Sequence, residues 1–504
     1  MISFDDVCAQ FALDGFASCT GGGSYDAARR PCHHYGRAPR GARFFYTGIV
    51  VLIVAAMIAI ASASRVPDRG LRAQLIAMVA GYGVLPLVLA MPLLQTHLGI
   101  GGSAAWFDML AAFTTTGAAP RYPEALPPTI TLWRAMVGWM GGLYILVMAN
   151  AILLPFGLGG AEIVLGGAGK SARGAHIAST TTAFDRLIDT ALIIFPVYGA
   201  LTLVLWAALA MAGEGSFVAL ITAMGVVSTS GIAAEAGGVA QQSGWLGEVM
   251  IFIALIVALS RHMMPVRGQL GRQMRGTRLY DPELRLGLIV VLVTAAALLV
   301  YHWIGRTPPT DATMARAIWG GLLLALSYLT TTGFESYSTQ MAMSWAGLQS
   351  PGLLLMGLAI IGGGAATTAG GVKLLRIYAL MRHGERELEK LVHPHSLGGS
   401  GQDARFIRRA GAQNAWVLFM LFALTIAMGA AAMTMTGQSF DASLAFVVAA
   451  LTNTGPLATS LPDLPLSYTA LNDQQMAILG VIMVAGRLEL LVLLAVLAPS
   501  SWRF

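Results

Sequence analysis

The chain has 504 residues, of which 56% are hydrophobic and only 11% are charged, with a formal net charge of +6. Soluble globular domains carry about 25% charged residues, so this composition excludes that class and indicates an integral membrane protein. The basic residues gather in a few loops, and this distribution argues against nucleic acid as the partner of the positive charge.

Long apolar runs follow one another along the chain. A transmembrane helix needs about 20 mostly apolar residues, and nine runs approach that requirement: 44–64, 73–95, 132–156, 187–212, 245–264, 284–304, 351–381, 412–436 and 474–498. Glycine or charge interrupts the runs at 245–264 and 351–381. We therefore expect an all-α polytopic membrane protein. Residues 1–41 are polar and glycine-rich, and their pattern assigns them no role.

Four short segments between these runs have nearly the same sequence. They are Thr114-Thr115-Thr116-Gly117, Ser228-Thr229-Ser230-Gly231, Thr330-Thr331-Thr332-Gly333 and Thr452-Asn453-Thr454-Gly455. Each follows a stretch with helical character that is too short to cross a membrane core of ~30 Å. These stretches are 103–113, 216–227, 315–329 and 441–451. Half-spanning helices with irregular backbone are tolerated only inside protein or beside a wet cavity, and four of them satisfy this condition together around one axis.

The order of parts around each motif is also repeated: a long helix, a short stretch, the motif and a second long helix. We expect four helix–pore helix–helix repeats around a central ion pathway, with one extra N-terminal helix before them. The expected boundaries are 1–41 for the polar segment, 42–70 for the extra helix, and 71–160, 161–272, 273–395 and 396–504 for the repeats.

The motif residues suit a monovalent cation. Glycine permits positive φ, which lets successive carbonyls point toward one axis, and rings of carbonyls replace the hydration shell of potassium in its channels. A calcium or magnesium site would need several carboxylates, which these loops do not offer. Glu335, two residues after Gly333, could attract cations at the outer mouth. One such motif is usually just a turn, but four equivalent ones favour a selectivity filter.

The positive charges define a topology. They concentrate at 261–285 and 373–409, whereas Arg121 is the only basic residue in the loops that carry the motifs. By the positive-inside rule the basic loops are cytoplasmic and the motifs open to the outside of the cytoplasmic (inner) membrane. The basic loops either only set this topology or also form the docking surface for a partner.

Residues 362–371 contain five glycines within one apolar run: Gly362, Gly363, Gly364, Gly370 and Gly371. Glycine costs about 1 kcal/mol relative to alanine in a helix, so this stretch is a poor helix. It is either a flexible kink that lets helices pack closely or an intramembrane loop that gates a pathway. We favour the gate, because broken helices at membrane depth usually line a pathway.

Charged residues also occur within or beside the apolar runs. Arg487 lies inside the last run, with Glu489 two residues later. It either forms a buried pair with Glu489 that only fixes helix packing or has a functional role, because a charge inside the membrane is expensive and usually functional. Lys373 and Arg376 follow the glycine-rich stretch and either snorkel to the cytoplasmic face or, for Lys373, belong to the gate.

Six sequence motifs carry a family resemblance that covers about residues 44–500. They are A-F-T-T-T-G-A (112–118), W-M-G-G-L (139–143), L-T-T-T-G-F-E (329–335), G-G-G-A-A-T-T-A-G-G-V-K (362–373), T-N-T-G-P (452–456) and G-R-L-E (486–489). With these motifs the chain resembles the Trk/Ktr/HKT superfamily of potassium transporters, and within it the bacterial TrkH membrane subunits. Such chains usually begin with two extra helices, whereas one is found here.

The resemblance implies a filter in which Gly117, Gly231, Gly333 and Gly455 are the filter glycines. The ion-binding carbonyls would then be those around Thr115, Thr116, Thr229, Ser230, Thr331, Thr332, Asn453 and Thr454. It implies the gate role for 362–371 and the barrier role for Arg487. It further implies potassium as the transported ion, no bound organic cofactor, a homodimer in the lipid bilayer, and a TrkA-like cytoplasmic nucleotide-binding regulatory subunit.

Other classes stay open at this stage. A less selective sodium and potassium transporter, or an ion-coupled carrier of another small solute, is the main alternative, and the sequence does not separate channel-like from coupled flux. A carrier predicts one or two unwound helices at the midplane rather than four matched loops. An enzyme is not expected, because the apolar runs are nearly free of clustered histidine, cysteine or carboxylate.

Overall fold

The computed structural model describes Met57 and residues 71–94, 101–120, 126–154, 183–234, 238–260, 281–305, 311–336, 351–393, 409–461 and 466–497. In these ranges every regular element is a helix, apart from one isolated bridge between Val239 and Ser336. The all-α architecture expected from the sequence is therefore confirmed. The polar segment 1–41 and, apart from Met57, the extra helix expected at 42–70 lie outside the described residues.

The chain divides into two compact units. One comprises Met1–Arg65 and Met91–Gly99, and the other comprises Val66–Ala90 and Ile100–Phe504. All of the packing and all of the site described below belong to the second unit.

The helices occur in four groups of the same order. The first is α3 (Leu71–Leu94), α4 (Gly102–Phe113) and α5 (Pro128–Met148) with the π-helical turn η2 (Ala149–Leu153). The second is α8 (Ala183–Met211), α9 (Ser216–Ser228) and α10 (Gly244–Ile256) with the 3-10 turn η4 (Val257–Leu259). The third is α12 (Pro282–Gly305), α13 (Asp311–Leu329), α15 (Pro351–Ile361) and α16 (Leu374–Val392). The fourth is α17 (Arg409–Met435), α18 (Phe440–Leu451), α19 (Pro456–Thr459), the 3-10 turn η8 (Tyr468–Ala470), α20 (Asp473–Leu488) and α21 (Leu490–Leu497).

The four short helices lie where the sequence predicts them. Helices α4, α9 and α18 have 12, 13 and 12 residues, which corresponds to about 18–20 Å at a rise of 1.5 Å per residue. Helix α13 has 19 residues and begins at Asp311, four residues before the expected start. At about 28 Å it is the exception to the expected half-spanning length. By length and composition, four helices of the described chain could cross a membrane: Ala73–Leu94, Pro128–Leu153, Phe184–Met211 and Ala412–Met435.

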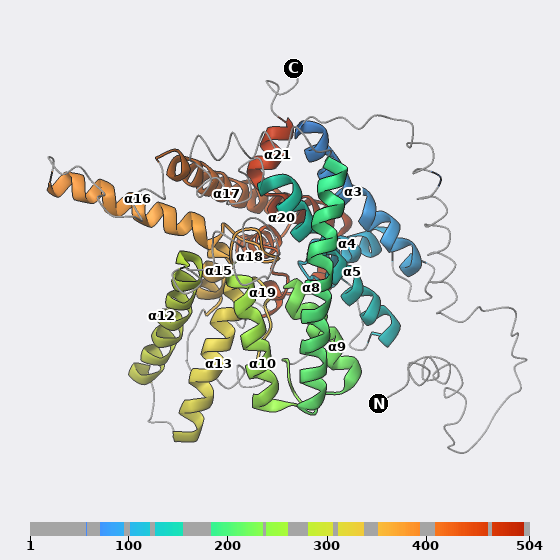
Figure 1. Ribbon diagram of the computed structural model, residues 1–504, viewed down its shortest axis with the longest axis horizontal. Coiled ribbons are helices and arrows are strands. Elements are labelled where there is room, and N and C mark those ends of the chain that lie inside the picture. The colour runs from blue at the N-terminus through green and yellow to red at the C-terminus, as the bar shows by residue number, and fades with distance from the viewer. Residues whose placement is uncertain are drawn as a thin grey trace, which may run out of the picture. The chain divides into compact units, whose positions relative to one another are not determined.

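The short helices α4, α9, α13 and α18, labelled in Figure 1, are connected by a cycle of helix–helix contacts. The helix that follows each motif packs against its own short helix and also against the short helix of the next group. Helix α5 contacts α4 and α9, α10 contacts α9 and α13, α15 contacts α13 and α18, and α20 contacts α18 and α4. The fourth group therefore closes onto the first, and the four short helices share one centre.

Small residues permit this close packing. A Cβ on Gly141 of α5 would lie 2.0 Å from the carbonyl oxygen of Phe113 at the end of α4. A Cβ on Gly486 of α20 would lie 2.0 Å from the carbonyl oxygen of Leu451 at the end of α18. Gly141 and Gly486 have equivalent roles in the first and fourth groups. Without a side chain, they let the helix that follows each motif contact the backbone at the end of the short helix.

Candidate functional site

The four short helices end with the same side-chain hydrogen bonds. The first motif residue of each (Thr114, Ser228, Thr330 and Thr452) donates its hydroxyl to the carbonyl oxygen four residues earlier, at 2.7–2.9 Å. The same hydroxyl lies 2.9–3.1 Å from the hydroxyl two residues later. The hydroxyl of the first motif residue thus caps each helix and contacts the hydroxyl of the third, and serine supplies the same groups in the second motif.

The second residue of each motif has a left-handed backbone. The φ angles are 55° at Thr115, 53° at Thr229, 57° at Thr331 and 55° at Asn453. The next N–H donates to the carbonyl five residues earlier, at 2.7–2.9 Å, which is the hydrogen bond of a Schellman motif. Glycine usually occupies this position, and a non-glycine residue there costs about 1–2 kcal/mol. Strain of this kind, repeated at four equivalent places, is typical of a functional site.

Three of the four motif glycines use positive φ, with 74° at Gly117, 65° at Gly231 and 75° at Gly333. The expectation that all four do so is wrong for Gly455, whose φ is −57°. Helix α19 begins at Pro456, directly after this glycine. Gly455 is therefore the N-cap of α19 and has helical backbone angles.

The motif loops form a closed ring in chain order. A Cβ on Gly117 would lie 2.1 Å from the carbonyl oxygen of Ser230, and one on Gly231 would lie 2.2 Å from that of Thr332. A Cβ on Gly333 would lie 2.9 Å from the Pro456 side chain. The ring closes where the N–H of Gly455 donates to the carbonyl oxygen of Thr116 at 2.6 Å. The structure therefore brings together all of the predicted filter residues.

Side-chain oxygens line one layer of this ring. The hydroxyls of Thr115 and Thr229 and the amide oxygen of Asn453 are buried without a hydrogen-bond partner among the described residues. The equivalent hydroxyl of Thr331 accepts a hydrogen bond from the N–H of Gly370 at 2.7 Å. Unpaired buried oxygens are costly, and these three occupy the same position in three of the four motifs.

The glycine-rich stretch 362–371 is an excursion between α15 and α16, and the kink interpretation is wrong. Its two ends are joined, because the N–H groups of Val372 and Lys373 donate to the carbonyls of Ile360 and Ile361 at 2.9 and 3.0 Å. Gly362 and Gly371 both have positive φ and a Cβ on either would collide with the other's backbone. Glycine at these two positions lets the chain leave and re-enter the helical path at one point.

The excursion lies directly against the motif loops. Besides the bond from Gly370 to Thr331, a Cβ on Gly370 would lie 2.0 Å from the carbonyl oxygen of Thr452. Thr368 lies 3.5 Å from the carbonyl oxygen of Val227, next to the second motif. A Cβ on Gly364 would lie 2.5 Å from the carbonyl oxygen of Leu259, so this part rests on η4. Three of the four groups thus contact this loop.

Arg487 holds the same loop from the other side. Its side chain is 4% exposed, and Nη1 donates to the carbonyl oxygen of Thr368 at 2.6 Å. Nε and Nη2 have no hydrogen-bond partner among the described residues. The alternative in which Arg487 pairs with Glu489 is wrong, because the carboxylate of Glu489 pairs with Arg376 at 2.7 Å.

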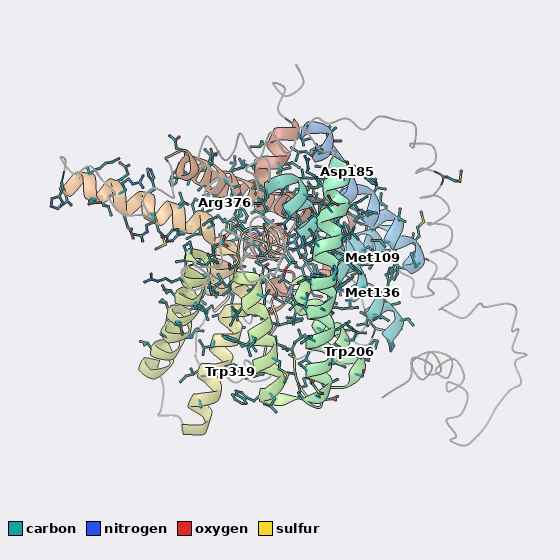
Figure 2. The ribbon with its side chains drawn as sticks, in the orientation of Figure 1. Met109, Met136, Asp185, Trp206, Trp319 and Arg376 are labelled. Atoms are coloured by element: carbon teal, nitrogen blue, oxygen red, sulfur yellow. The ribbon has the colours of Figure 1, made fainter. Side chains whose placement is uncertain are left out.

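The snorkelling interpretation is also wrong for Lys373 and Arg376. Both residues are buried. The ammonium of Lys373 donates to the carbonyl oxygen of Ala369 inside the glycine-rich loop. Arg376, labelled in Figure 2 at the start of α16, forms the ion pair with Glu489. Both cations therefore face inward, toward the glycine-rich loop or the break between α20 and α21.

Buried polar groups also anchor the chain at the end of the fourth motif and just after the third. Tyr468 of η8 donates its hydroxyl to the carbonyl oxygen of Gly455 at 3.0 Å. Glu248 of α10 accepts hydrogen bonds from Trp319 on α13 (labelled in Figure 2), at 2.8 Å, and from Ser336. The sequence did not predict these roles. Tyr468 and Glu248 stand outside any motif, and their partners become neighbours only in the folded chain.

Glu335, two residues after Gly333, is half-buried. Burial raises the pKa of its carboxyl above the ordinary 4.5, and the hydrogen bond from the Ser460 hydroxyl offsets part of that rise. The backbone carbonyl of Glu335 accepts from the N–H of Val239 at 2.8 Å, which fixes this segment to the second group.

Comparisons with known proteins agree with this architecture. Residues 284–503 match the family model described as TrkH, cation transport protein. The Trk system potassium uptake protein TrkH of Vibrio parahaemolyticus is 28% identical over 437 residues, 84% of each chain. The protein of the same name in Escherichia coli K12 is 28% identical over 467 residues, 92% of each chain. The crystal structure of the potassium transporter TrkH from Vibrio parahaemolyticus has a TM-score of 0.73 at 25% identity and covers 93% of each chain. These names describe transport proteins, and none of them describes an enzyme.

Proposed function

Because the chain belongs to the TrkH family of cation transport proteins, we propose that it takes up potassium ions across the cytoplasmic membrane. The observation that carries this proposal is the closed ring of four motif loops, in which the last loop donates a hydrogen bond to the first. A ring of backbone carbonyls with no carboxylate in the motifs suits an ion that is monovalent and readily dehydrated.

The ring serves as the selectivity filter in this proposal. The carbonyls of the second and third motif residues face the ion, and the strained left-handed turn of each motif is what directs them to the axis. The short helices aim their C-terminal ends, which carry partial negative charge, toward the space next to the filter. A cation is therefore stabilised there before or after it passes through the ring.

The glycine-rich loop 362–371 serves as the gate. It contacts the filter through Thr331 and Thr452 and is held by Arg487, so its position blocks the path on one side of the ring. The buried guanidinium adds an electrostatic barrier to cations at the same place. The joined ends of the loop favour a motion in which the excursion shifts while α15 and α16 stay in register.

Further features of the proposal concern topology and partners. The filter faces the outside and the basic segments around 261–285 and 373–409 face the cytoplasm, as their charge predicts. The names of the relatives refer to a Trk system, which supports a separate regulatory component. We propose a homodimer that binds a TrkA-like cytoplasmic nucleotide-binding subunit through these basic segments, with no organic cofactor in this chain.

Uptake of rubidium and sodium into liposomes that contain the purified chain tests the function. We expect rubidium uptake to exceed sodium uptake, and empty liposomes give the background. If the gate is closed in the isolated chain, addition of the nucleotide-binding subunit restores uptake. Equal uptake of both ions by folded protein would favour the less selective transporter, and uptake of neither ion in the presence of the regulatory subunit would contradict the proposal.

Glu335 gives the transporter a predicted pH dependence. Since burial raises the pKa of this carboxyl above 4.5, it loses its charge at a higher pH than an ordinary glutamic acid as the solution is acidified. We expect rubidium uptake to fall as the external pH drops through this raised value, because the outer mouth loses a negative charge. Uptake by the Glu335→Gln variant should be lower at neutral pH and should lack this fall, whereas an unchanged pH profile in that variant would exclude the role.

A further inference from the structure

The contact between the first and fourth motif loops differs from the other contacts in the ring. Here Gly455, which lacks the positive φ of the other three glycines, donates its N–H to the carbonyl oxygen of Thr116, and a Cβ on Gly455 would lie 2.6 Å from the backbone nitrogen of Ala118. We call this contact the 1–4 seam. It is the place where the ends of the ring meet, so its width depends on how firmly both loops are held.

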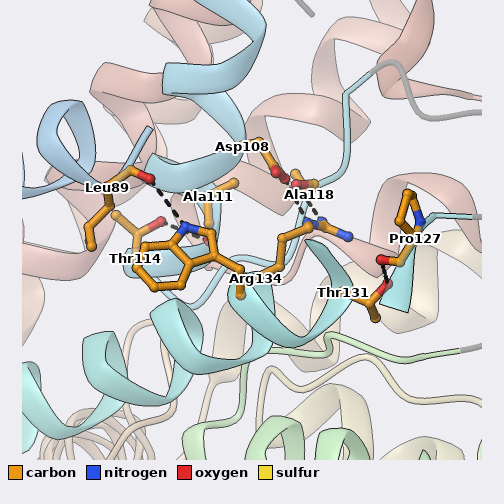
Figure 3. Close-up of polar contacts among 9 residues, drawn as sticks. Leu89, Asp108, Ala111, Thr114, Ala118, Pro127, Thr131 and Arg134 are labelled. Atoms are coloured by element: carbon orange, nitrogen blue, oxygen red, sulfur yellow. Dashed lines mark hydrogen bonds and ion pairs between the residues drawn. The ribbon is translucent and has the colours of Figure 1, made fainter. Parts of the chain in front are cut away.

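A buried ion pair holds the first loop at this seam (Figure 3). Arg134 of α5 lies 2.8 Å from Asp108 of α4, measured from Nε to Oδ1, and both side chains are nearly inaccessible at 6% and 0% exposure. Nη2 of the same arginine donates to the carbonyl oxygen of Ala118 at 3.4 Å. One guanidinium therefore connects the short helix to the residue directly after Gly117.

The fourth loop is held at the same seam by a neutral group. The hydroxyl of Tyr468 donates to the carbonyl oxygen of Gly455 at 3.0 Å, and its ring packs against Phe107 and Phe446, with centroids 6.3 and 5.2 Å away. Phe107 lies on α4 and is the neighbour in sequence of Asp108. Arg134 thus holds the first loop and Tyr468 holds the fourth loop, and both contact adjacent residues of α4, Asp108 and Phe107.

The ion pair is specific to the first group. Counting back six residues from the first motif residue gives Asp108 in α4, and the same count gives Thr222 in α9, Leu324 in α13 and Phe446 in α18. None of these three can pair with a guanidinium as a carboxylate does. Replacing a buried ion pair by apolar residues is often neutral or stabilising, so packing alone does not require a pair at this position.

We propose that the Asp108–Arg134 pair and Tyr468 are positioning residues for ion selectivity, which clamp the 1–4 seam and thereby set the width of the filter. This inference rests on the proposed function. The pair acts through the carbonyl of Ala118, and its carboxylate cancels the charge that a lone guanidinium would place beside a path for cations. Loosening the clamp lets the carbonyls close around a smaller ion, so sodium competes better with rubidium.

Two variants test the clamp without leaving an unpaired buried charge. The double variant Asp108→Asn/Arg134→Gln is neutral and removes the bond to Ala118, and Tyr468→Phe removes one hydroxyl without changing the shape of the ring. Each is expected to lower the ratio of rubidium to sodium uptake in liposomes by about threefold to tenfold, the effect of one lost hydrogen bond. Arg134→Lys keeps the charge but loses the forked geometry, so its ratio is expected to fall as well.

Matched controls separate this role from a general loss of structure. Arg186→Gln removes a guanidinium that bonds Gln74 at 2.9 Å, and Tyr144→Phe removes a hydroxyl that bonds the carbonyl oxygen of Met78 at 3.3 Å. Both are expected to lower the melting temperature slightly while the uptake ratio stays at the wild-type value. If the controls lower the ratio as much as the seam variants do, the clamp is overturned.

The remaining outcomes are also decisive. Wild-type selectivity in both Tyr468→Phe and Arg134→Lys overturns the proposal even when the double variant fails to fold. If the wild-type chain itself takes up rubidium and sodium equally, the proposed function fails first. If the wild type prefers rubidium and the seam variants keep the same preference, the clamp is refuted while the proposed function stands.

Discussion

Gly231→Ala is expected to remove most of the preference for rubidium over sodium and to lower total uptake. Gly231 has a φ of 65°, and the new Cβ would lie 2.2 Å from the carbonyl oxygen of Thr332. This neighbour is backbone in the next motif loop and cannot turn away as a side chain would. The left-handed conformation adds a cost of about 1–2 kcal/mol for any other residue, so the ring must open at this contact.

The measurement is the ratio of rubidium to sodium uptake in liposomes, and we expect a fall of at least about tenfold, which corresponds to ~1.4 kcal/mol. Gly357→Ala is the matched control, because Gly357 lies in α15 with nothing within 4 Å of an added Cβ. It should fold as well as the wild type, since alanine favours a helix. If the Gly231→Ala protein keeps the wild-type ratio of rubidium to sodium uptake, the second motif loop is not part of the filter.

Arg487→Gln should raise basal uptake in the absence of any regulatory subunit. The substitution removes a buried positive charge that lies against the glycine-rich loop and donates to Thr368 at 2.6 Å. A unit charge 4 Å from a passing cation repels it by about 4 kcal/mol at an effective dielectric constant near 20. We therefore expect an increase of at least about tenfold, since the repulsion disappears and the loop loses its hold.

Arg376→Gln is the comparison that separates a barrier from packing. Arg376 is 1% exposed and pairs with Glu489, which would be left as a buried carboxylate. Breaking such a pair costs about 3–5 kcal/mol, so the expected result is a lower melting temperature rather than faster uptake. If Arg487→Gln instead destabilises the protein in the same way and leaves the uptake per folded molecule unchanged, the arginine is a packing residue.

The repeat and the site were accessible to sequence reasoning because they depend on local chemistry. The short helices depend on short consecutive stretches of sequence, and the motif recurs four times. The hydroxyl caps and the left-handed backbone of the second motif residues were not predicted, since positive φ was expected at the motif glycines. The glycine-rich excursion was predicted for the same reason, since five glycines in residues 362–371 exclude a stable helix. The cyclic packing follows from the repeat once every group has the same parts.

Other features depend on contacts between distant residues, which a single sequence does not show. Glu489 pairs with Arg376, 113 positions away, rather than with the nearby Arg487, because the helix breaks at Glu489 with a φ of 64°. The helical φ of Gly455 depends on helix α19, which starts at Pro456. The sequence T-N-T-G-P contains this proline but does not by itself show that a new helix begins there. The roles of Tyr468 and Glu248 likewise depend on partners that are distant in sequence, Gly455 for the tyrosine and Trp319 for the glutamate.

The order of the ring has a consequence for how the protein is made. The side-chain bond from Asn453 to Thr116 joins positions 337 apart, beside the backbone bond that closes the seam. Contacts at such separation form late, because the intervening chain must first be ordered, and synthesis proceeds from the N-terminus. The ring of motif loops therefore stays open between the first and third loops until the fourth group has been synthesised. We therefore expect the proposed filter to discriminate between ions only after the last hundred or so residues of the chain have folded.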